Sequence, residues 1–180
     1  MIKFLHIPKT GGTSILNATK GKGNGHELIS DFDGECFSCC RNPYDRACSL
    51  YWFMLGKYKE AEKRRPFSMA SGYMSLVDFW TTANERENQL TIRLMTPQMD
   101  YLRDKPGEGG ISPRIKHLLR YETLQEDWPA FAAKHGFAEL PHLNKSERPA
   151  PWQDEMTPEL VAIINERFAD DFEQLGYERL

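Results

Sequence analysis

The chain has few cysteines, no excess of positive charge and no long apolar run, and each lack excludes a class of protein. Its 23 basic and 26 acidic residues give a net charge of −3, which argues against a general nucleic-acid-binding surface. The longest apolar stretches have the length of a strand, so no segment is predicted to span a membrane. Because the first predicted strand follows Met1 without the charged and apolar regions of a signal peptide, we expect a cytoplasmic protein.

The four cysteines lie close together but do not form a complete metal-binding pattern. Cys36 and Cys39 have the spacing of half a zinc or redox motif, yet no second pair and no paired histidines follow at ligand spacing. We therefore interpret all four, Cys36, Cys39, Cys40 and Cys48, as reduced and buried side chains. With 180 residues and no internal repeat, residues 1–180 are predicted to form a single domain.

Apolar segments alternate with helical patterns along the chain, which predicts an α/β fold with a parallel sheet. Strands are expected at residues 2–7, 35–41 and 114–121. Helices are expected at residues 13–20, 43–57, 76–86 and 124–135, and a closing helix begins at Thr157. Residues 96–113 are rich in proline and glycine and are predicted to form a loop. Ligands of such sheets bind at the carboxyl ends of the strands.

Residues 6–14 (HIPKTGGTS) join the first predicted strand to the first predicted helix and have the character of an anion-binding loop. Unpaired N–H groups and the positive end of the dipole favour an anion at the start of a helix. Gly11 and Gly12 let an anion approach the backbone, and Lys9 adds a positive charge. Further hydroxyl donors come from Thr10, Thr13 and Ser14. An ordinary strand–turn–helix corner with a surface lysine is the alternative.

A second candidate anion site lies in residues 40–51 (CRNPYDRACSLY). Arg41 ends the second predicted strand, and Ser49 lies outside the apolar face of the following helix. A guanidinium beside a helical hydroxyl can hold a phosphate through charge-assisted hydrogen bonds. In the alternative interpretation, Arg41 is a structural ion-pair partner of Asp45 and Ser49 is a neutral helix residue. Taken alone, this segment leaves both interpretations open.

Together the two segments resemble the cofactor motifs of sulfotransferases that use 3′-phosphoadenosine 5′-phosphosulfate (PAPS), most closely those of the carbohydrate branch that includes heparan sulfate 2-O-sulfotransferase. Weaker pieces of the resemblance follow in family order at Gly25-His26, 121–125, 140–146 and 169–177. The resemblance implies a P-loop-NTPase-like three-layer fold, in which helices flank a central parallel sheet. It also implies PAPS as the sulfuryl donor and no metal ion.

The resemblance further implies the roles of individual residues in binding PAPS. Residues 9–14 would hold the 5′-phosphosulfate, whereas Arg41 and Ser49 would bind the 3′-phosphate. Lys145 and Ser146 match a late loop that covers the cofactor, so they are candidate phosphate or ribose contacts. The acceptor would be a hydroxyl group of a small molecule or a glycan, and a carbohydrate is expected. Its identity stays open, as does the oligomeric state.

The chemistry of sulfuryl transfer assigns two candidate catalytic residues. Charge grows on the leaving phosphate during in-line transfer, and Lys9 is placed to stabilise it. The acceptor hydroxyl needs a general base, for which His26 is the candidate because a neutral imidazole can take the proton. Glu27 is the alternative base. His6 is interpreted as structural, and Glu122 as an anchor of loops through an arginine.

Two other classes of function remain alternatives. A P-loop small-molecule kinase has its lysine after the glycines and a hydroxyl ligand for magnesium, whereas Lys9 precedes Gly11 and no GK[ST] sequence occurs. A non-catalytic phosphate- or glycan-binding module would keep Arg41 and Ser49 but could dispense with Lys9 and His26. Turnover of PAPS distinguishes the enzyme from the module, and metal-dependent use of ATP distinguishes the kinase.

Overall fold

A computed structural model describes residues 2–21, 23, 25–64, 75–86, 93–105, 107, 109–141 and 148–180. Its centre is a parallel sheet with the strand order β1-β2-β3. The strands are β1 (Lys3–Leu5), β2 (Cys36–Cys40) and β3 (Ile115–Arg120). The predicted parallel α/β arrangement is therefore confirmed, although each strand is shorter than the sequence suggested.

The position of β2 at the centre of the sheet explains why apolar and polar residues do not alternate in its sequence. All five of its residues are buried because helices cover both faces of the sheet. Its one polar side chain, Ser38, donates a hydrogen bond of 2.8 Å to the carbonyl oxygen of Leu5 on β1. The four cysteines are free and buried, as the sequence analysis predicted.

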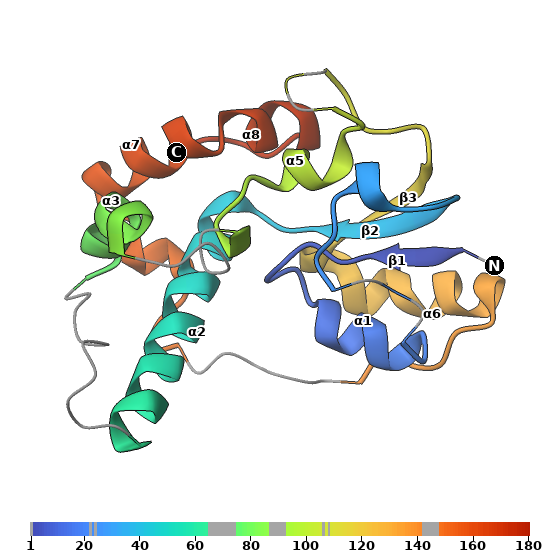
Figure 1. Ribbon diagram of the computed structural model, residues 1–180, viewed down its shortest axis with the longest axis horizontal. Helices are drawn as coiled ribbons and strands as arrows, with labels where there is room; N and C mark the ends of the chain where they lie inside the picture. The colour runs from blue at the N-terminus through green and yellow to red at the C-terminus, as the bar shows by residue number, and fades with distance from the viewer. Residues whose placement is uncertain are drawn as a thin grey trace.

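The helices next to the sheet form a layer on each of its faces (Figure 1). Below the sheet in this view lie α1 (Gly12–Ala18) and α6 (Leu124–His135), whose apolar side chains pack against Phe4 and Phe37. Above it lie α5 (Gln98–Leu102) and α8 (Ala169–Leu175), which pack against Leu5 and Cys40. Side chains of adjacent strand residues thus enter separate cores, as the pleat requires.

A third apolar core lies away from the sheet, among three further helices. The long helix α2 (Pro43–Arg64) starts just after β2 and runs away from the sheet, and it packs with α3 (Leu76–Arg86) and α7 (Pro158–Arg167) (Figure 1). Side-chain oxygens cap two of these helices: Ser75 accepts from the Asp78 N–H at 3.1 Å, and Thr157 accepts from the Leu160 N–H at 3.2 Å. Three short 3₁₀ turns complete the described elements: η1 (Ile29–Asp31), η2 (Tyr121–Thr123) and η3 (Trp152–Glu155).

Two further differences from the sequence-based expectation concern helices. The segment 96–113, predicted to be a loop, contains the short helix α5. The closing helix is divided into α7 and α8 near Phe168, whose backbone leaves the helical conformation. In the first case the helix is stabilised from outside, because a carboxylate of α8 accepts its first N–H groups.

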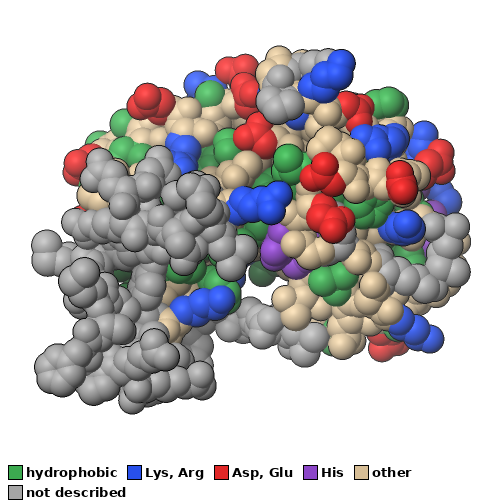
Figure 2. Space-filling model, in the orientation of Figure 1, with side chains coloured by type: hydrophobic (Ala, Val, Ile, Leu, Met, Phe, Trp, Pro, Cys, Tyr) green, Lys and Arg blue, Asp and Glu red, His purple; other side chains and the backbone are tan. Residues whose placement is uncertain are grey.

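Two observations on the described part of the chain concern membrane-spanning helices and surface charge. None of the described helices combines the length and the apolar character that crossing a membrane would require. On the described part of the face in Figure 2, acidic and basic side chains are interspersed, so this part carries no broad patch of positive charge. The compartment and the predicted absence of nucleic-acid partners remain predictions.

Candidate functional site

The loop between β1 and α1 forms a tight turn that is held by its own polar groups. Lys9 and Gly11 both have positive φ values, 68° and 83°, which is uncommon for a lysine. The Thr10 hydroxyl donates to the Ile7 carbonyl oxygen at 2.9 Å, and the Ser14 N–H donates to the Gly11 carbonyl oxygen at 3.1 Å. These two donors, expected to serve an anion, are thus already used within the loop. Thr13 is exposed.

Gly12 is required because the ring of His6 lies against its backbone. A Cβ at this position would lie 1.9 Å from His6 Nε2, a separation that atoms cannot adopt. His6 is 8% exposed, and burial, followed by the charges of His26 and Lys9, lowers its pKa to about 3. The neutral ring therefore supports the turn, in agreement with the structural role expected from the sequence.

We expect Gly12→Ala to destabilise the protein by about 1–3 kcal/mol, the usual range for overpacking a well-packed site. The rigid His6 ring must move to admit the new methyl group. Urea unfolding of the variant and the wild type measures this difference. Gly56→Ala is the matched control, because a Cβ there meets nothing within 4 Å and alanine favours the helix by roughly 0.5–1 kcal/mol. Equal stability of the two variants would contradict the close contact at Gly12.

His26 lies against the same loop and contacts it through one of its two ring nitrogens. Its Nδ1 lies 3.1 Å from the carbonyl oxygen of His6, and the two imidazole rings are 4.0 Å apart. A carbonyl oxygen can only accept, so the neutral ring carries its proton on Nδ1 and keeps the lone pair on Nε2. Burial lowers the pKa of His26, and the charges of Arg46 and Lys9 act in the same direction against the hydrogen bond to His6. His26 is therefore a neutral potential base close to Lys9.

Several positive charges meet at Lys9. Its Nζ lies 4.0 Å from the ring centre of Phe53 on α2, and Lys57 Nζ lies 4.6 Å from the same ring centre. Burial lowers the pKa of Lys9 to about 8, assisted by the charges of Arg41, Lys57 and Arg148. Within the described residues no carboxylate forms an ion pair with Lys9 or Lys57. This excess of cations favours an anionic ligand.

Arg41 brings the second predicted motif into contact with the first. Its Nη1 donates to the carbonyl oxygen of Lys9 at 2.9 Å, and its guanidinium lies 3.9 Å from the ring centre of Tyr121. Its Nε donates to Asp45 at 2.6 Å, so the ion pair of the alternative interpretation is present. The other oxygen of Asp45 accepts from Arg148 at 2.6 Å. Two guanidinium groups share one carboxylate, so these three side chains together carry one net positive charge.

A cavity of about 470 Å³ opens beside these arginines. It is lined by Arg41, Asp45, Tyr121, Arg148 and residues 149–153. Tyr121 and Arg148 were not predicted as site residues; Tyr121 lies in the weakly matching segment 121–125, whereas nothing local marks Arg148. Ser49 is buried on α2 at 1% exposure. Lys145 and Ser146 lie outside the described residues, so their predicted contacts are not located.

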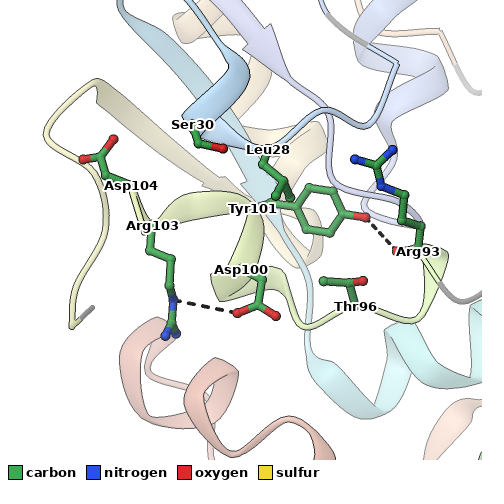
Figure 3. Close-up of a pocket in the computed structure, with 8 residues that line it drawn as sticks. All are labelled: Leu28, Ser30, Arg93, Thr96, Asp100, Tyr101, Arg103 and Asp104. Carbon is green, nitrogen blue, oxygen red and sulfur yellow. Dashed lines mark hydrogen bonds and ion pairs between the residues drawn. The ribbon is translucent and has the colours of Figure 1, made fainter. Parts of the chain in front are cut away.

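A smaller cavity, of about 200 Å³, lies where η1 approaches α5 (Figure 3). Its lining residues are Leu28, Ser30, Arg93, Thr96, Asp100, Tyr101, Arg103 and Asp104. The Tyr101 hydroxyl donates to the Arg93 carbonyl oxygen at 2.8 Å, and Arg103 lies 3.9 Å from Asp100 (Figure 3). Both charge signs are present in this wall, and part of it belongs to the segment 96–113.

Glu122 anchors the site, but through different partners than expected. Its carboxylate accepts from the Asn42 N–H at 2.6 Å and from the Tyr177 hydroxyl at 3.0 Å. We expected an arginine partner, but the partners are the backbone amide next to Arg41 and a phenol. Glu122 therefore links the residue before α2 to the segment that follows α8.

No protein-family model, curated protein or solved structure matches this chain. The resemblance to sulfotransferases thus rests on the motifs of the sequence alone. Among the described residues there is also no group of three or more histidine, cysteine, aspartate or glutamate side chains placed to hold a metal ion.

Proposed function

We propose that this protein is a PAPS-dependent sulfotransferase with a P-loop-like fold, which transfers the sulfuryl group to a hydroxyl acceptor. The observation that carries the proposal is the 2.9 Å hydrogen bond from Arg41 Nη1 to the carbonyl oxygen of Lys9. It joins two segments that lie far apart in the sequence and were separately predicted to bind anions. Both follow strands of one parallel sheet at their carboxyl ends, where such folds bind ligands.

The distribution of charge fits a donor with two anionic groups. Lys9 would hold the phosphosulfate end, where its ammonium group has no carboxylate partner among the described residues. Arg41 and Arg148 would hold the 3′-phosphate in the larger cavity, with the exposed Tyr121 ring at its edge. An arginine fork already oriented by Asp45 loses little freedom on binding a phosphate. When bound, PAPS supplies the sulfuryl group and a phosphate leaving group.

Sulfuryl transfer requires a base for the acceptor proton and a positive group beside the leaving phosphate. Residues of the Lys9 loop and the adjacent His26 would meet these two requirements. Nε2 of His26 would take the proton of the acceptor hydroxyl, because Nδ1 is occupied by the His6 carbonyl. The Lys9 ammonium would stabilise the negative charge that develops on the departing oxygen. The smaller cavity begins at Leu28, two residues after His26, and is our candidate for the acceptor site.

Nucleotide affinity tests the proposal directly. We expect titration calorimetry without magnesium to show that 3′-phosphoadenosine 5′-phosphate binds at least about tenfold more tightly than AMP, because the second phosphate gains charge-assisted hydrogen bonds. Arg41→Ala should abolish most of this preference. Arg179→Ala serves as the control, because Arg179 pairs with Glu173 at 3.0 Å on the surface.

Other outcomes of the same experiment would favour the alternatives. Equal affinity for the two nucleotides, or an absolute requirement for magnesium, would overturn the sulfotransferase proposal in favour of a kinase. Preference for the doubly phosphorylated nucleotide without turnover of PAPS in an acceptor screen would indicate a binding module. Mass spectrometry of the screen would also identify the acceptor class.

A further inference from the structure

The backbone of Arg41 is held by a side chain from the segment that the sequence analysis predicted to be a loop. Gln98 Oε1 accepts from the Arg41 N–H at 2.9 Å, and Gln98 Nε2 donates to the Arg41 carbonyl oxygen at 2.8 Å. The strand pairing of β2 with β3 ends one residue earlier, at Cys40. The Gln98 amide therefore continues the hydrogen bonding of the sheet at a buried position where unpaired polar groups are costly.

A second buried group orients Gln98. Asp171 Oδ2 accepts from the Gln98 N–H at 2.9 Å and from Gln98 Nε2 at 3.3 Å, while Oδ1 accepts from the Met99 N–H at 2.8 Å. Gln98 and Asp171 are both fully buried. Because the carboxylate and the Arg41 carbonyl oxygen can only accept, the amide of Gln98 has one orientation that satisfies both. Asp171 on α8 thus determines how Gln98 meets Arg41.

The same segment also holds the anion-binding loop. Arg46 Nε donates to the Pro8 carbonyl oxygen at 3.0 Å, and its Nη2 donates to the carbonyl oxygens of Leu94 at 3.2 Å and Thr96 at 2.9 Å. Arg46 is 3% exposed. Residues 94–99 are therefore tied to Pro8, next to Lys9, through Arg46 and to Arg41 through Gln98. A single short segment links the two predicted anion sites.

We propose that Gln98, oriented by Asp171, is a positioning residue that sets Arg41 at the separation from the Lys9 loop that a ligand with two anionic groups requires. This inference rests on the proposed function, since it takes Arg41 as a ligand of the second phosphate. Gln98 and Asp171 touch no ligand themselves. Substituting either residue should change the preference for a nucleotide with two phosphates over a nucleotide with one. A purely structural role would leave this preference unchanged.

The test compares neighbouring aspartates of α8 in the full chain. Asp171→Asn keeps the shape but replaces one acceptor oxygen by a donor that faces N–H groups. We expect calorimetry to show about a tenfold loss of affinity for 3′-phosphoadenosine 5′-phosphate and little change for AMP. Asp170→Asn should leave both affinities unchanged, because Asp170 is largely exposed and pairs with Arg103 at the surface of α8.

Gln98→Asn provides an independent variant, because its amide is one methylene too short to span Arg41 and Asp171. Circular dichroism establishes that each variant is folded before it is titrated. An equal loss of affinity for both nucleotides, or the failure of both variants to fold, would overturn the positioning role and leave the proposed function intact. Absence of a nucleotide preference in the wild type would overturn the proposed function itself.

Discussion

Replacement of His26 by alanine is expected to lower the turnover of sulfuryl transfer by about 10²–10⁴-fold, the usual contribution of a positioned general base. The acceptor hydroxyl is a weak nucleophile until its proton is removed, and Nε2 of the neutral His26 ring carries a lone pair beside the Lys9 loop. Single-turnover measurements with PAPS and an acceptor found by screening give the rate of the chemical step. Affinity for 3′-phosphoadenosine 5′-phosphate should change little.

The pH dependence gives an independent readout for His26. Burial lowers the pKa of this imidazole below its ordinary value of 6.5, so the ring stays neutral, and the rate stays high, down to a pH below 6.5. The acid limb of the pH profile should disappear in His26→Ala. His117→Ala is the control histidine, because His117 packs against Phe131 and His135 near α6. An unchanged rate in His26→Ala would move the base to Glu27 or to the acceptor cavity.

Lys9→Ala is expected to reduce turnover by about 10²–10³-fold, comparable to the loss of one donor that stabilises developing negative charge. The ammonium group is most useful where the leaving phosphate gains charge, so affinity should fall less than turnover. Single-turnover assays and calorimetry on the same variant measure the two effects. Lys3→Ala is the control. Lys3 is exposed on β1, and its Nζ lies 5.8 Å from the ring centre of Phe32.

The alkaline side of the pH profile tests the charge of Lys9. With a pKa of about 8 in the free protein, the ammonium group loses its proton as the pH rises through this value, so kcat/KM should fall above about pH 8. A bound anion favours the protonated form, which should shift the same limb of kcat to higher pH. Lys9→Arg should lose the limb. Weak binding with an intact chemical step in Lys9→Ala would assign Lys9 to anchoring alone.

The elements that the sequence predicted well are those with a strong local pattern. The buried run of β2 and the helical spacing of Tyr44, Ala47, Cys48 and Tyr51 on α2 depend on neighbours within a few residues. The helix α5 could not be found in this way. Its five residues follow Pro97 in a segment rich in proline and glycine, and its first N–H groups are satisfied by Asp171, which is distant in the sequence.

The residues of the candidate site also fall into those with a local sequence pattern and those without one. Residues of the Lys9 loop and Arg41 lie in contiguous motifs, so their residue types and spacing were sufficient to suggest anion binding. The ion pair between Arg41 and Asp45 could be predicted, because Asp45 lies one helical turn after Arg41. The second ion pair of Asp45, with the distant Arg148, could not. Arg148, Gln98 and Tyr121 reach the site from other parts of the chain. No local pattern marks Arg148 or Gln98, and Tyr121 lies in a segment that only weakly matches the sulfotransferase motifs.

The sequence by itself determined the parallel α/β class and the turn into α1, because backbone geometry and hydrophobic periodicity are properties of neighbouring residues. It also supplied the two candidate anion-binding motifs, whose ligand remains a proposal. Only the tertiary structure decided that the motifs touch through Arg41 and the Lys9 carbonyl, and that the neutral His26 ring keeps its lone pair on Nε2. It also decided that Gln98 and Asp171 hold Arg41. Such contacts depend on how distant segments pack, since a buried polar group must find its partner wherever the fold brings one within reach.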